Sequence, residues 1–388
     1  MSQARSINRQ KRKQRRRIIG LVLCIIVCVL LFLLIFGVIR KDGPKPDQVT
    51  GLKADACYAQ IELTWEPAKN ASGYYIYASD DGHPQKVAEI SGAENCKYTI
   101  DEYTYDREYQ FQVSGYGYNR LTHRTNEGEL SDKVTAIYEP DQHAQKIPVL
   151  AYHKVVPADE TFSSSLLIAD STLEQQLTWL KDNGYKTLTM DEFYQWYKGK
   201  LEVPVKSCVY TFDDGFYGVY HLAYPIFKRL DMAGTAFCIG KNTEGPTAAF
   251  DPNEEKDHYI GYDVIEKSRK EYPKFSFESH TYDMHNRVNG KKPALSFSYD
   301  QIMKDCEANA KFGFRYLAYP WGAYSETMQK AVKDSGYRMA FSYGPYKYAT
   351  RDDNQFAVNR IKISGKMGMD SFIRIVSGED EAYDIGVD

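Results

Sequence analysis

The sequence predicts an α/β protein, an irregular (β/α) barrel preceded by a small all-β sandwich and one transmembrane helix. Three observations predict this arrangement. Apolar strand-like runs alternate with helical runs over residues 145–388, short alternating runs separated by turn residues fill residues 44–140, and an uncharged apolar run covers residues 18–39.

The first 39 residues predict a membrane anchor. Residues 1–17 carry eight basic side chains and no acidic one, and the apolar run that follows is 22 residues long. About 20 apolar residues cross a bilayer as a helix, and no small-residue cleavage site follows the run. We therefore expect an uncleaved signal anchor in a single-pass cell membrane protein. Residues 1–17 would be cytoplasmic, and the part of the chain after the span would be extracellular.

The net charge limits the partners. The whole chain carries −3, and without the eight basic residues of the tail the remainder carries −11. An acidic extracellular part argues against nucleic acid and against anionic polymers as substrates. It suits a neutral sugar or a cationic product.

Residues 44–140 predict a β-sandwich, because about seven short alternating runs in about ninety residues are typical of that fold. The segment resembles a fibronectin type III module, with Trp65 on its second strand and a tyrosine-bearing strand at residues 109–113. It contains no recognisable chemistry, so we expect a spacer or a weak binding module. Cys57 and Cys96 are candidates for a disulfide here.

From residue 147 the chain alternates between strands and helices. Strands are predicted at residues 148–153, 187–189, 208–212, 235–239, 275–279, 316–319 and 339–341. Helices are predicted from Ser171, which forms a capping-box pattern with Glu174, and over residues 191–197, 219–230, 262–272, 300–312 and 326–334. In such barrels the chemistry gathers where the strands end.

Two adjacent carboxylates follow one of these strands. The strand over residues 208–212 runs directly into Asp213, Asp214 and Gly215. Neighbouring carboxylates repel each other and resist desolvation, so such a pair is kept where a cation or a proton transfer uses both. The alternative is a solvated turn, because Asp-Asp-Gly is ordinary loop chemistry.

Two further groups stand at strand ends. His280 and His285 follow one strand, and imidazole with carboxylate suits Zn²⁺ and similar ions. Their spacing of five residues requires a turn, and a purely structural pair is the alternative.

A tight turn follows a later strand and consists of Tyr319, Pro320 and Trp321 with a glycine after them. It presents the Trp321 N–H, and a simple packed turn is the alternative.

Together these three groups resemble the polysaccharide deacetylase family, carbohydrate esterase family 4. The resemblance covers about residues 147–378 and is nearest to the poly-N-acetylglucosamine deacetylase branch. It implies that Asp214, His280 and His285 bind a divalent metal, with zinc favoured, and that Asp213 is the general base. It also assigns Tyr319, Pro320 and Trp321 to substrate and oxyanion contacts.

Three positions depart from the family pattern. The histidine spacing is one residue longer than usual. Ala318 stands where the family has an arginine before the proline turn, and Arg315 comes too early to replace it. Residues 361–363 lack the late histidine that supplies the general acid. His153, at the end of the first barrel strand, is the substitute we expect, and a buried structural histidine is the alternative.

The expected function is therefore metal-dependent removal of N-acetyl groups from a glucosamine-containing cell-surface polysaccharide, either peptidoglycan or exopolysaccharide. The expected partners are an N-acetylated glycan and the membrane, with no nucleic acid. Two alternatives remain at this point. One is a non-catalytic glycan-binding or adhesion protein on a degenerate scaffold, and the other is an O-acetyl esterase.

Overall fold

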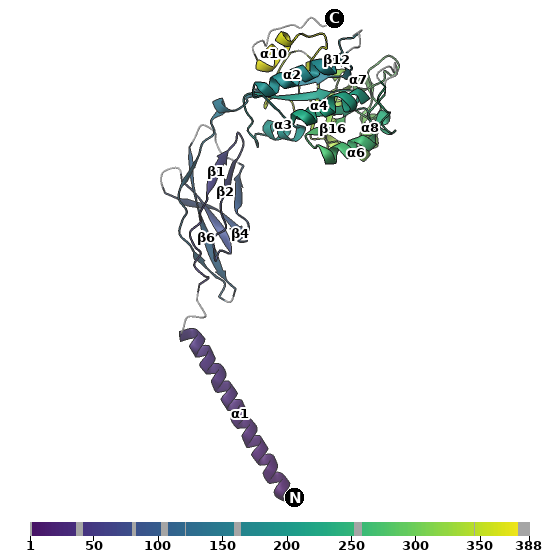
Figure 1. Ribbon diagram of the computed structural model, residues 1–388. Helices are drawn as coiled ribbons and strands as arrows, with labels where there is room; N and C mark the ends of the chain where they lie inside the picture. The colour runs from purple at the N-terminus through teal and green to yellow at the C-terminus, as the bar shows by residue number, and fades with distance from the viewer. Residues whose placement is uncertain are drawn as a thin grey trace. The chain divides into compact units, whose positions relative to one another are not determined.

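The computed structural model describes residues 2–35, 42–79, 83–101, 108–120, 122–158, 164–251, 258–344 and 346–378, with side chains from residue 14 to 32 in the first of these ranges. The chain divides into two compact units. The first comprises residues 1–56 and 60–138, and the second comprises residues 57–59 and 139–388. Figure 1 labels the main helices and strands of each unit.

The N-terminal helix α1 covers Ser2–Ile35. Over the described residues, no helix combines the length and the apolar character that crossing a membrane requires. The predicted span covers residues 18–39, and its last four residues lie outside the described part of the chain.

The rest of the first unit consists of two antiparallel sheets. One has the strand order β1-β2-β5, and the other has β4-β3-β6-β7 with β8 paired to β6. The strands are β1 (Lys53–Ala56), β2 (Ile61–Thr64), β3 (Gly73–Ser79), β4 (Gln85–Ser91), β5 (Lys97–Ile100), β6 (Tyr109–Asn119), β7 (Arg124–Glu127) and β8 (Val134–Ala136).

The two sheets share one core, as the alternating pattern predicts. Its buried side chains come from both sheets and include Ile61, Leu63, Trp65, Ile76 and Val113. Cys57 and Cys96, the candidates for a disulfide, are not bonded to each other in the structure. The Cys96 sulfur lies 3.5 Å from the Tyr74 hydroxyl instead.

The second unit is built on a parallel sheet. Its strand order is β18-β17-β16-β15-β14-β10-β20, with β13 paired to β14. The strands are β10 (Val149–Tyr152), β13 (Lys186–Thr187), β14 (Ser207–Phe212), β15 (Gly234–Cys238), β16 (Phe275–Ser279), β17 (Tyr316–Ala318), β18 (Met339–Phe341) and β20 (Ile361–Lys362). Two short pairs lie beside it, β9 (Lys146–Ile147) with β19 (Ala349–Thr350) and β11 (Lys154–Val156) with β12 (Leu167–Ala169).

The two edges of this sheet are hydrogen bonded to each other. The Ser342 N–H donates to the Val358 carbonyl at 2.8 Å, and the Val358 N–H donates to the Ala340 carbonyl at 3.0 Å. A parallel bridge between Gly344 and Ile361 continues the contact. The sheet therefore curves back on itself, in an irregular form rather than as eight equal β/α units.

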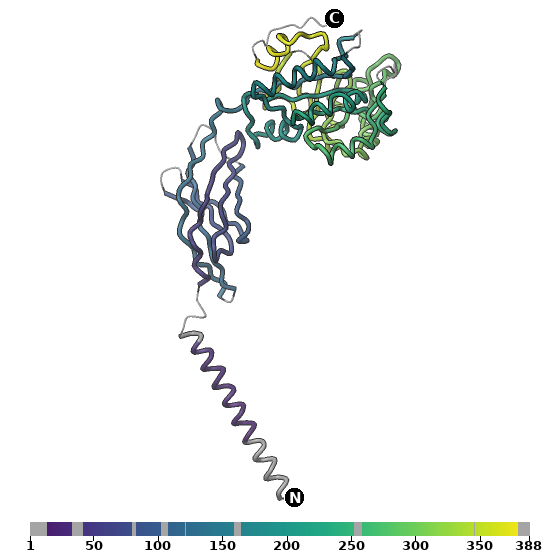
Figure 2. The backbone as a smooth tube through the Cα atoms, viewed as in Figure 1, coloured from purple at the N-terminus to yellow at the C-terminus, as the bar shows by residue number. Residues whose placement is uncertain are grey.

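Helices surround the sheet (Figure 1). They are α2 (Asp170–Asp182), α3 (Met190–Tyr197), α4 (Tyr224–Leu230), α5 (Gly240–Thr243), α6 (Tyr262–Glu271), α7 (Pro293–Ser296), α8 (Tyr299–Asn309), α9 (Glu326–Asp334) and α10 (Met369–Ser377). The C-terminal helix α10, yellow in Figure 2, belongs to the same apolar core as Leu177 of α2.

The predicted helix cap at Ser171 is wrong. Helix α2 begins one residue earlier, at Asp170, and the Asp170 carboxylate accepts the Ser171 N–H at 2.7 Å. Complete capping boxes occur instead at Thr189 before α3 and at Ser298 before α8.

All six residues of β14 are buried, as expected of a parallel strand covered on both faces. Cys208, Tyr210 and Phe212 pack in the core under the helices. Val209 packs in a second core with Phe237 and Phe341. Because side chains alternate along a strand, Asp213 lies on the same face of the sheet as Val209. This is the inner face of the curved sheet, opposite the face that packs under the helices of the first core.

Candidate active site

The polar residues singled out in the sequence lie at one edge of the parallel sheet. Asp213 and Asp214 follow β14, His280 follows β16, Trp321 follows β17, and His153 follows β10. All these strands are parallel, so their carboxyl ends meet at one edge.

A tight turn separates the two carboxylates. Asp214 and Gly215 both have left-handed backbone conformations, with φ of 69° and 72°. Such a conformation is uncommon for a residue with a side chain and is found at sites where the surroundings hold it. Here the Asp213 N–H donates to the Tyr152 carbonyl at 2.9 Å, and the Ile260 N–H donates to the Gly215 carbonyl at 2.8 Å.

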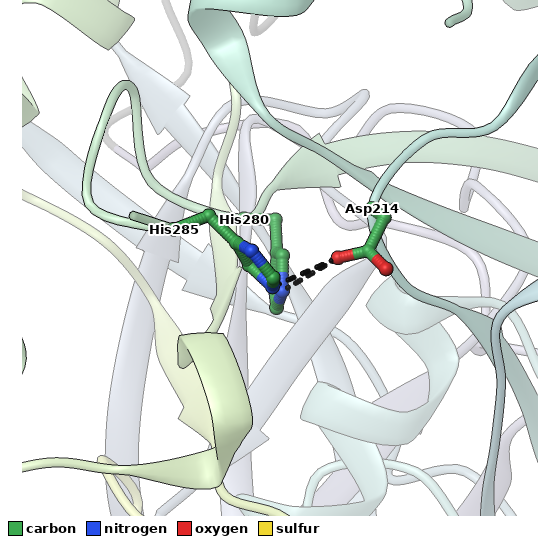
Figure 3. A group of neighbouring side chains, drawn as sticks. All are labelled: Asp214, His280 and His285. Carbon is green, nitrogen blue, oxygen red and sulfur yellow. Dashed lines mark ion pairs between the residues drawn. The ribbon is translucent and has the colours of Figure 1, made fainter. Parts of the chain in front are cut away.

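Asp214 points at both histidines (Figure 3). Its Oδ1 atom lies 3.4 Å from His280 Nε2 and 3.0 Å from His285 Nε2. One ligand atom from each residue lies within 4.8 Å of the others. The structure therefore brings together the three residues that the sequence analysis proposed as metal ligands.

The protonation of His280 follows from its second nitrogen. His280 Nδ1 lies 2.9 Å from the Ala318 carbonyl oxygen, which can only accept a hydrogen bond, so Nδ1 carries the hydrogen. Nε2 is then the nitrogen that faces Asp214 and that can offer its lone pair to a metal ion. A histidine held in this way is typical of a metal ligand.

The three residues fit a cation. Asp214 Oδ1 is buried and, among the described residues, has no hydrogen-bond partner of good geometry despite the two nearby nitrogens. Burial acts to raise the pKa of Asp214, but the two histidines outweigh it and hold that pKa well below its usual range. Burial likewise lowers the pKa of His285, and Asp214 reverses this and raises it. A carboxylate oxygen and two imidazole nitrogens directed at one point can bind a cation, which takes the place of a proton on the imidazole nitrogen.

Asp213 forms a different contact on the inner face. Arg360 Nη1 and Nη2 donate to its two carboxylate oxygens at 2.6 and 2.7 Å. Arg360 also donates to Thr211 Oγ1 at 3.1 Å and to the Ser342 carbonyl at 3.0 Å, and its side chain is fully buried. Although burial acts to raise the pKa of Asp213, Arg360 lowers it, so the carboxylate stays ionised.

Arg360 was not expected at the site from the sequence. The family pattern has its arginine before the proline turn, which follows β17. Arg360 instead stands directly before β20, and β17 and β20 lie on opposite sides of β14 in the strand order. One signal pointed to it: it is the only charged residue within the run from Phe356 to Ile361. A charged side chain in such a run is buried only when a partner of opposite charge meets it.

His153 lies near both carboxylates. Burial lowers its pKa, while the charges of Asp213 and Asp214 oppose that change. Its ring meets the Tyr343 ring edge-on at 5.9 Å between centroids. It is therefore close enough to the site to feel the charge of both aspartates.

Of the three turn residues, only Trp321 is available to a substrate. Tyr319 was expected to contact the sugar, but it is fully buried and its hydroxyl donates to the Phe356 carbonyl at 2.9 Å. Pro320 is also buried and shapes the turn. Trp321 is partly exposed, has a left-handed backbone with φ 54°, and its ring centroid lies 4.7 Å from that of His285.

Comparisons with known proteins agree with this geometry. Residues 200–340 match the family described as polysaccharide deacetylase. A putative polysaccharide deacetylase of Bacillus subtilis, YxkH, is 30% identical over 241 residues, which cover 61% of this chain and 78% of the relative. The poly-β-1,6-N-acetyl-D-glucosamine N-deacetylase of Staphylococcus aureus is 32% identical over 237 residues, covering 55% and 78% respectively.

Solved structures share the fold. The Streptococcus pyogenes deacetylase PplD superposes with a TM-score of 0.51 at 24% identity, over 60% of this chain and 98% of that one. The de-N-acetylase of Aggregatibacter actinomycetemcomitans superposes with a TM-score of 0.50 at 23% identity, over 59% and 99%. An Fn3-like protein of Clostridium thermocellum superposes with a TM-score of 0.20 at 22% identity, over 25% of this chain and 94% of that one. The fibronectin type III resemblance of residues 44–140 stays a prediction.

The second unit thus has the α/β deacetylase fold, with an acid–histidine cluster at the carboxyl ends of its strands. The chain belongs to the polysaccharide deacetylase family, and is related to the poly-N-acetylglucosamine N-deacetylases.

Proposed function

We propose that this protein is a metal-dependent hydrolase that removes N-acetyl groups from a glucosamine-containing cell-surface polysaccharide. The observation that carries the proposal is the convergence of Asp214, His280 and His285 beside the ionised Asp213. The name of the Staphylococcus aureus relative supports the choice of an N-acetylated glucosamine polymer.

Asp214, His280 and His285 would hold the metal. Two imidazoles and one carboxylate are a ligand set that suits Zn²⁺ and leaves positions open for water and substrate. When bound there, the ion would lower the pKa of water and polarise the acetyl carbonyl.

Asp213 is the proposed general base. A base has to be ionised before it can take a proton, and Arg360 keeps Asp213 ionised inside the protein. The two parallel hydrogen bonds from the guanidinium also fix the plane of the carboxylate.

His153 and the Trp321 backbone complete the set of proposed roles. His153 would donate a proton to the leaving amine. Pro320 and Trp321 open a 3₁₀ turn, and the first N–H groups of such a turn lack partners within it. The Trp321 N–H would therefore be available to the oxyanion, and one such donor typically stabilises the transition state by about 3 kcal/mol.

Arg360 also bears on the non-catalytic alternative. That alternative rested partly on the missing arginine of the family pattern. Arg360 provides a guanidinium on Asp213 from another part of the chain, which favours an enzyme over a degenerate scaffold.

We also propose a cell-membrane location with the second unit outside. This rests on the basic residues 1–17 and the apolar residues 18–39.

The central test combines metal analysis with acetate release. Metal-stripped protein reloaded with Zn²⁺ is expected to release acetate from N-acetylglucosamine oligomers. Asp214→Asn is expected to lose bound zinc and at least about 100-fold in rate, because a ligand is removed. Asp370→Asn, an exposed first-turn residue of α10, is the matched control. Wild-type acetate release by Asp214→Asn would refute the metal assignment.

A further inference from the structure

We infer that a basic rim beside the metal-ligand cluster binds a negatively charged substituent of the glycan. The basic rim consists of Arg287, Lys291 and Lys292. This inference rests on the proposed function and narrows its substrate to N-acetylated glycans that carry a carboxylate or phosphate group close to the acetamide.

The basic rim lies beside the site because it follows His285 closely in the sequence. His285 is followed by a tight hairpin in which Val288 and Lys291 donate hydrogen bonds to each other at 3.0 Å. Asn289 and Gly290 at its tip both have positive φ, 50° and 75°, as a two-residue hairpin turn requires. The Arg287 guanidinium donates to the Gly290 carbonyl at 3.0 Å, so the arginine is held by its own hairpin.

Two of the cations face the ring that lies against His285. The Arg287 guanidinium carbon is 5.9 Å from the Trp321 ring centroid, and the Lys292 amine is 5.6 Å from it. The same ring centroid lies 4.7 Å from that of His285. Cations over an indole ring are held in place by its quadrupole. Trp321 therefore fixes two positive charges at the border of the site.

These charges are not neutralised within the described part of the chain. No carboxylate described in the structure forms an ion pair with Arg287, Lys291 or Lys292. Other lysines near the same loop are neutralised: Lys241 pairs with Asp283 at 2.6 Å, and Lys311 pairs with Glu244. The contrast places a local excess of positive charge on the Trp321 side of the cluster.

This local charge outweighs the acidic character of the whole chain. At physiological salt, charges on the surface are screened over about 8 Å. A substituent that reaches Trp321 therefore interacts with the basic rim far more strongly than with distant acidic residues. The basic rim is a local exception to the acidic net charge, which argues against anionic polymers elsewhere on the chain.

The ligand chemistry follows from the side chains. An arginine presents a planar fork that matches carboxylate and phosphate oxygens, and a lysine adds a mobile point charge. A neutral sugar can accept hydrogen bonds from these side chains, but it gains no charge attraction from them. The shared chemistry is therefore an anionic oxygen group on a sugar next to the one that is deacetylated.

Three matched oligosaccharide series test the inference on the zinc-loaded full chain. They are neutral N-acetylglucosamine oligomers, oligomers alternating with a lactyl-ether acid sugar, and oligomers carrying a sugar 6-phosphate. Both kcat/KM and the dissociation constant from calorimetry are measured at low and high salt. We expect one anionic series to be preferred, and the choice between them identifies the source of the charge.

Variants locate the effect. Arg287→Gln and Lys292→Gln are each expected to lower kcat/KM and affinity for the anionic series by roughly 10-fold, as loss of a charged hydrogen bond predicts, with the neutral series unchanged. Arg287→Lys should restore part of the loss. Lys333→Gln, on the exposed last turn of α9, is the control and should change neither series.

Two results would overturn the inference: equal use of neutral and anionic series by the wild type, or equal losses on both series in the Gln variants. Failure of the proposed function is a separate result, recognised by no acetate release from any series. In that case the binding constants still decide whether the basic rim takes anions.

Discussion

At the scale of single residues, the contact between Asp213 and Arg360 determines what the carboxylate can do. A buried carboxylate without a partner takes up a proton, because burial disfavours its charge. Arg360 offsets that cost with two hydrogen bonds and lowers the pKa of Asp213. The same contact makes Asp213 a weaker proton acceptor, so its ionised state at neutral pH comes with a lower basicity.

Replacement of Arg360 tests this account. Arg360→Met leaves Asp213 buried and unpaired, so we expect its pKa to rise, the acid limb of the pH–rate profile to move to higher pH, and kcat to fall by about 100-fold or more. Arg360→Lys should recover part of the rate. Removing one partner of a buried pair costs about 3–5 kcal/mol of stability, so folding is checked by circular dichroism. Zinc affinity should change little, and a large loss of affinity would show that Arg360 acts through the metal ligands.

Glu278 is a second buried carboxylate on the inner face, and within the described part of the chain no cationic group forms an ion pair with it. Its Oε2 atom accepts the Arg315 and Tyr316 N–H groups at 2.7 and 3.1 Å, which ties β16 to the start of β17. Burial raises the pKa of Glu278 to about 7, and the two N–H groups offset only part of that effect.

A pKa raised in the folded state means that the folded protein binds more protons than the unfolded chain. Stability should therefore fall as the pH rises from about 4.5 to 7, by up to about 3 kcal/mol from this residue. We expect Glu278→Gln to be more stable relative to wild type at pH 8 than at pH 5. Urea unfolding of the metal-free proteins, followed by tryptophan fluorescence, measures the difference. An equal gap at both pH values would show that Glu278 does not titrate in this range.

At the scale of elements, helix α8 holds the loop between the two histidines. The Asp305 carboxylate accepts the Tyr282 N–H and the Asp283 N–H, both at 2.8 Å. Thr281 has a left-handed backbone with φ 66°, which turns the chain so that both imidazoles reach one point. A spacing of five residues therefore works here because a neighbouring helix fixes the loop.

We expect Asp305→Ala to weaken zinc binding about 10-fold or more although it touches neither histidine, because residues that orient metal ligands typically contribute 10–100-fold to affinity. Asp305→Asn keeps one acceptor oxygen and should lie between Ala and wild type. Direct titration of the metal-free protein with Zn²⁺ measures the affinity. Asp300→Asn, exposed on the first turn of the same helix, is the control. Unchanged affinity in Asp305→Ala would mean that the loop holds its shape without α8.

At the scale of the whole molecule, the candidate site lies in the second unit. Among the described residues, the acid–histidine cluster lies only there, and the sandwich contains no comparable group. Residues 1–43 precede both folded regions and contain the proposed anchor.

Removal of residues 1–43 should therefore separate location from catalysis. We expect the full chain in the membrane fraction and the shortened chain in the aqueous fraction, with the same acetate release per molecule. Fractionation followed by the acetate assay measures both. A full chain found in the aqueous fraction would contradict the proposed location, whatever its activity.

Much of this protein is encoded locally. The alternation of apolar runs predicted the strands that precede Asp213, His280 and Trp321, because a buried strand followed by polar residues can be recognised from neighbouring positions. The sandwich strands were predicted in the same way. The ends of elements were predicted less accurately, since helix α2 starts one residue before the cap expected at Ser171.

Other features depend on contacts between distant residues. Strand β20 has two residues, too few for a periodic pattern, so neither it nor the adjacent Arg360 could be placed from the sequence. Tyr319 looked like a sugar contact until packing buried it. Side-chain identity and spacing determined which chemical groups the chain carries and near which strand ends they fall. Only the curvature of the sheet decided which of them meet, because that depends on pairings between residues more than a hundred positions apart.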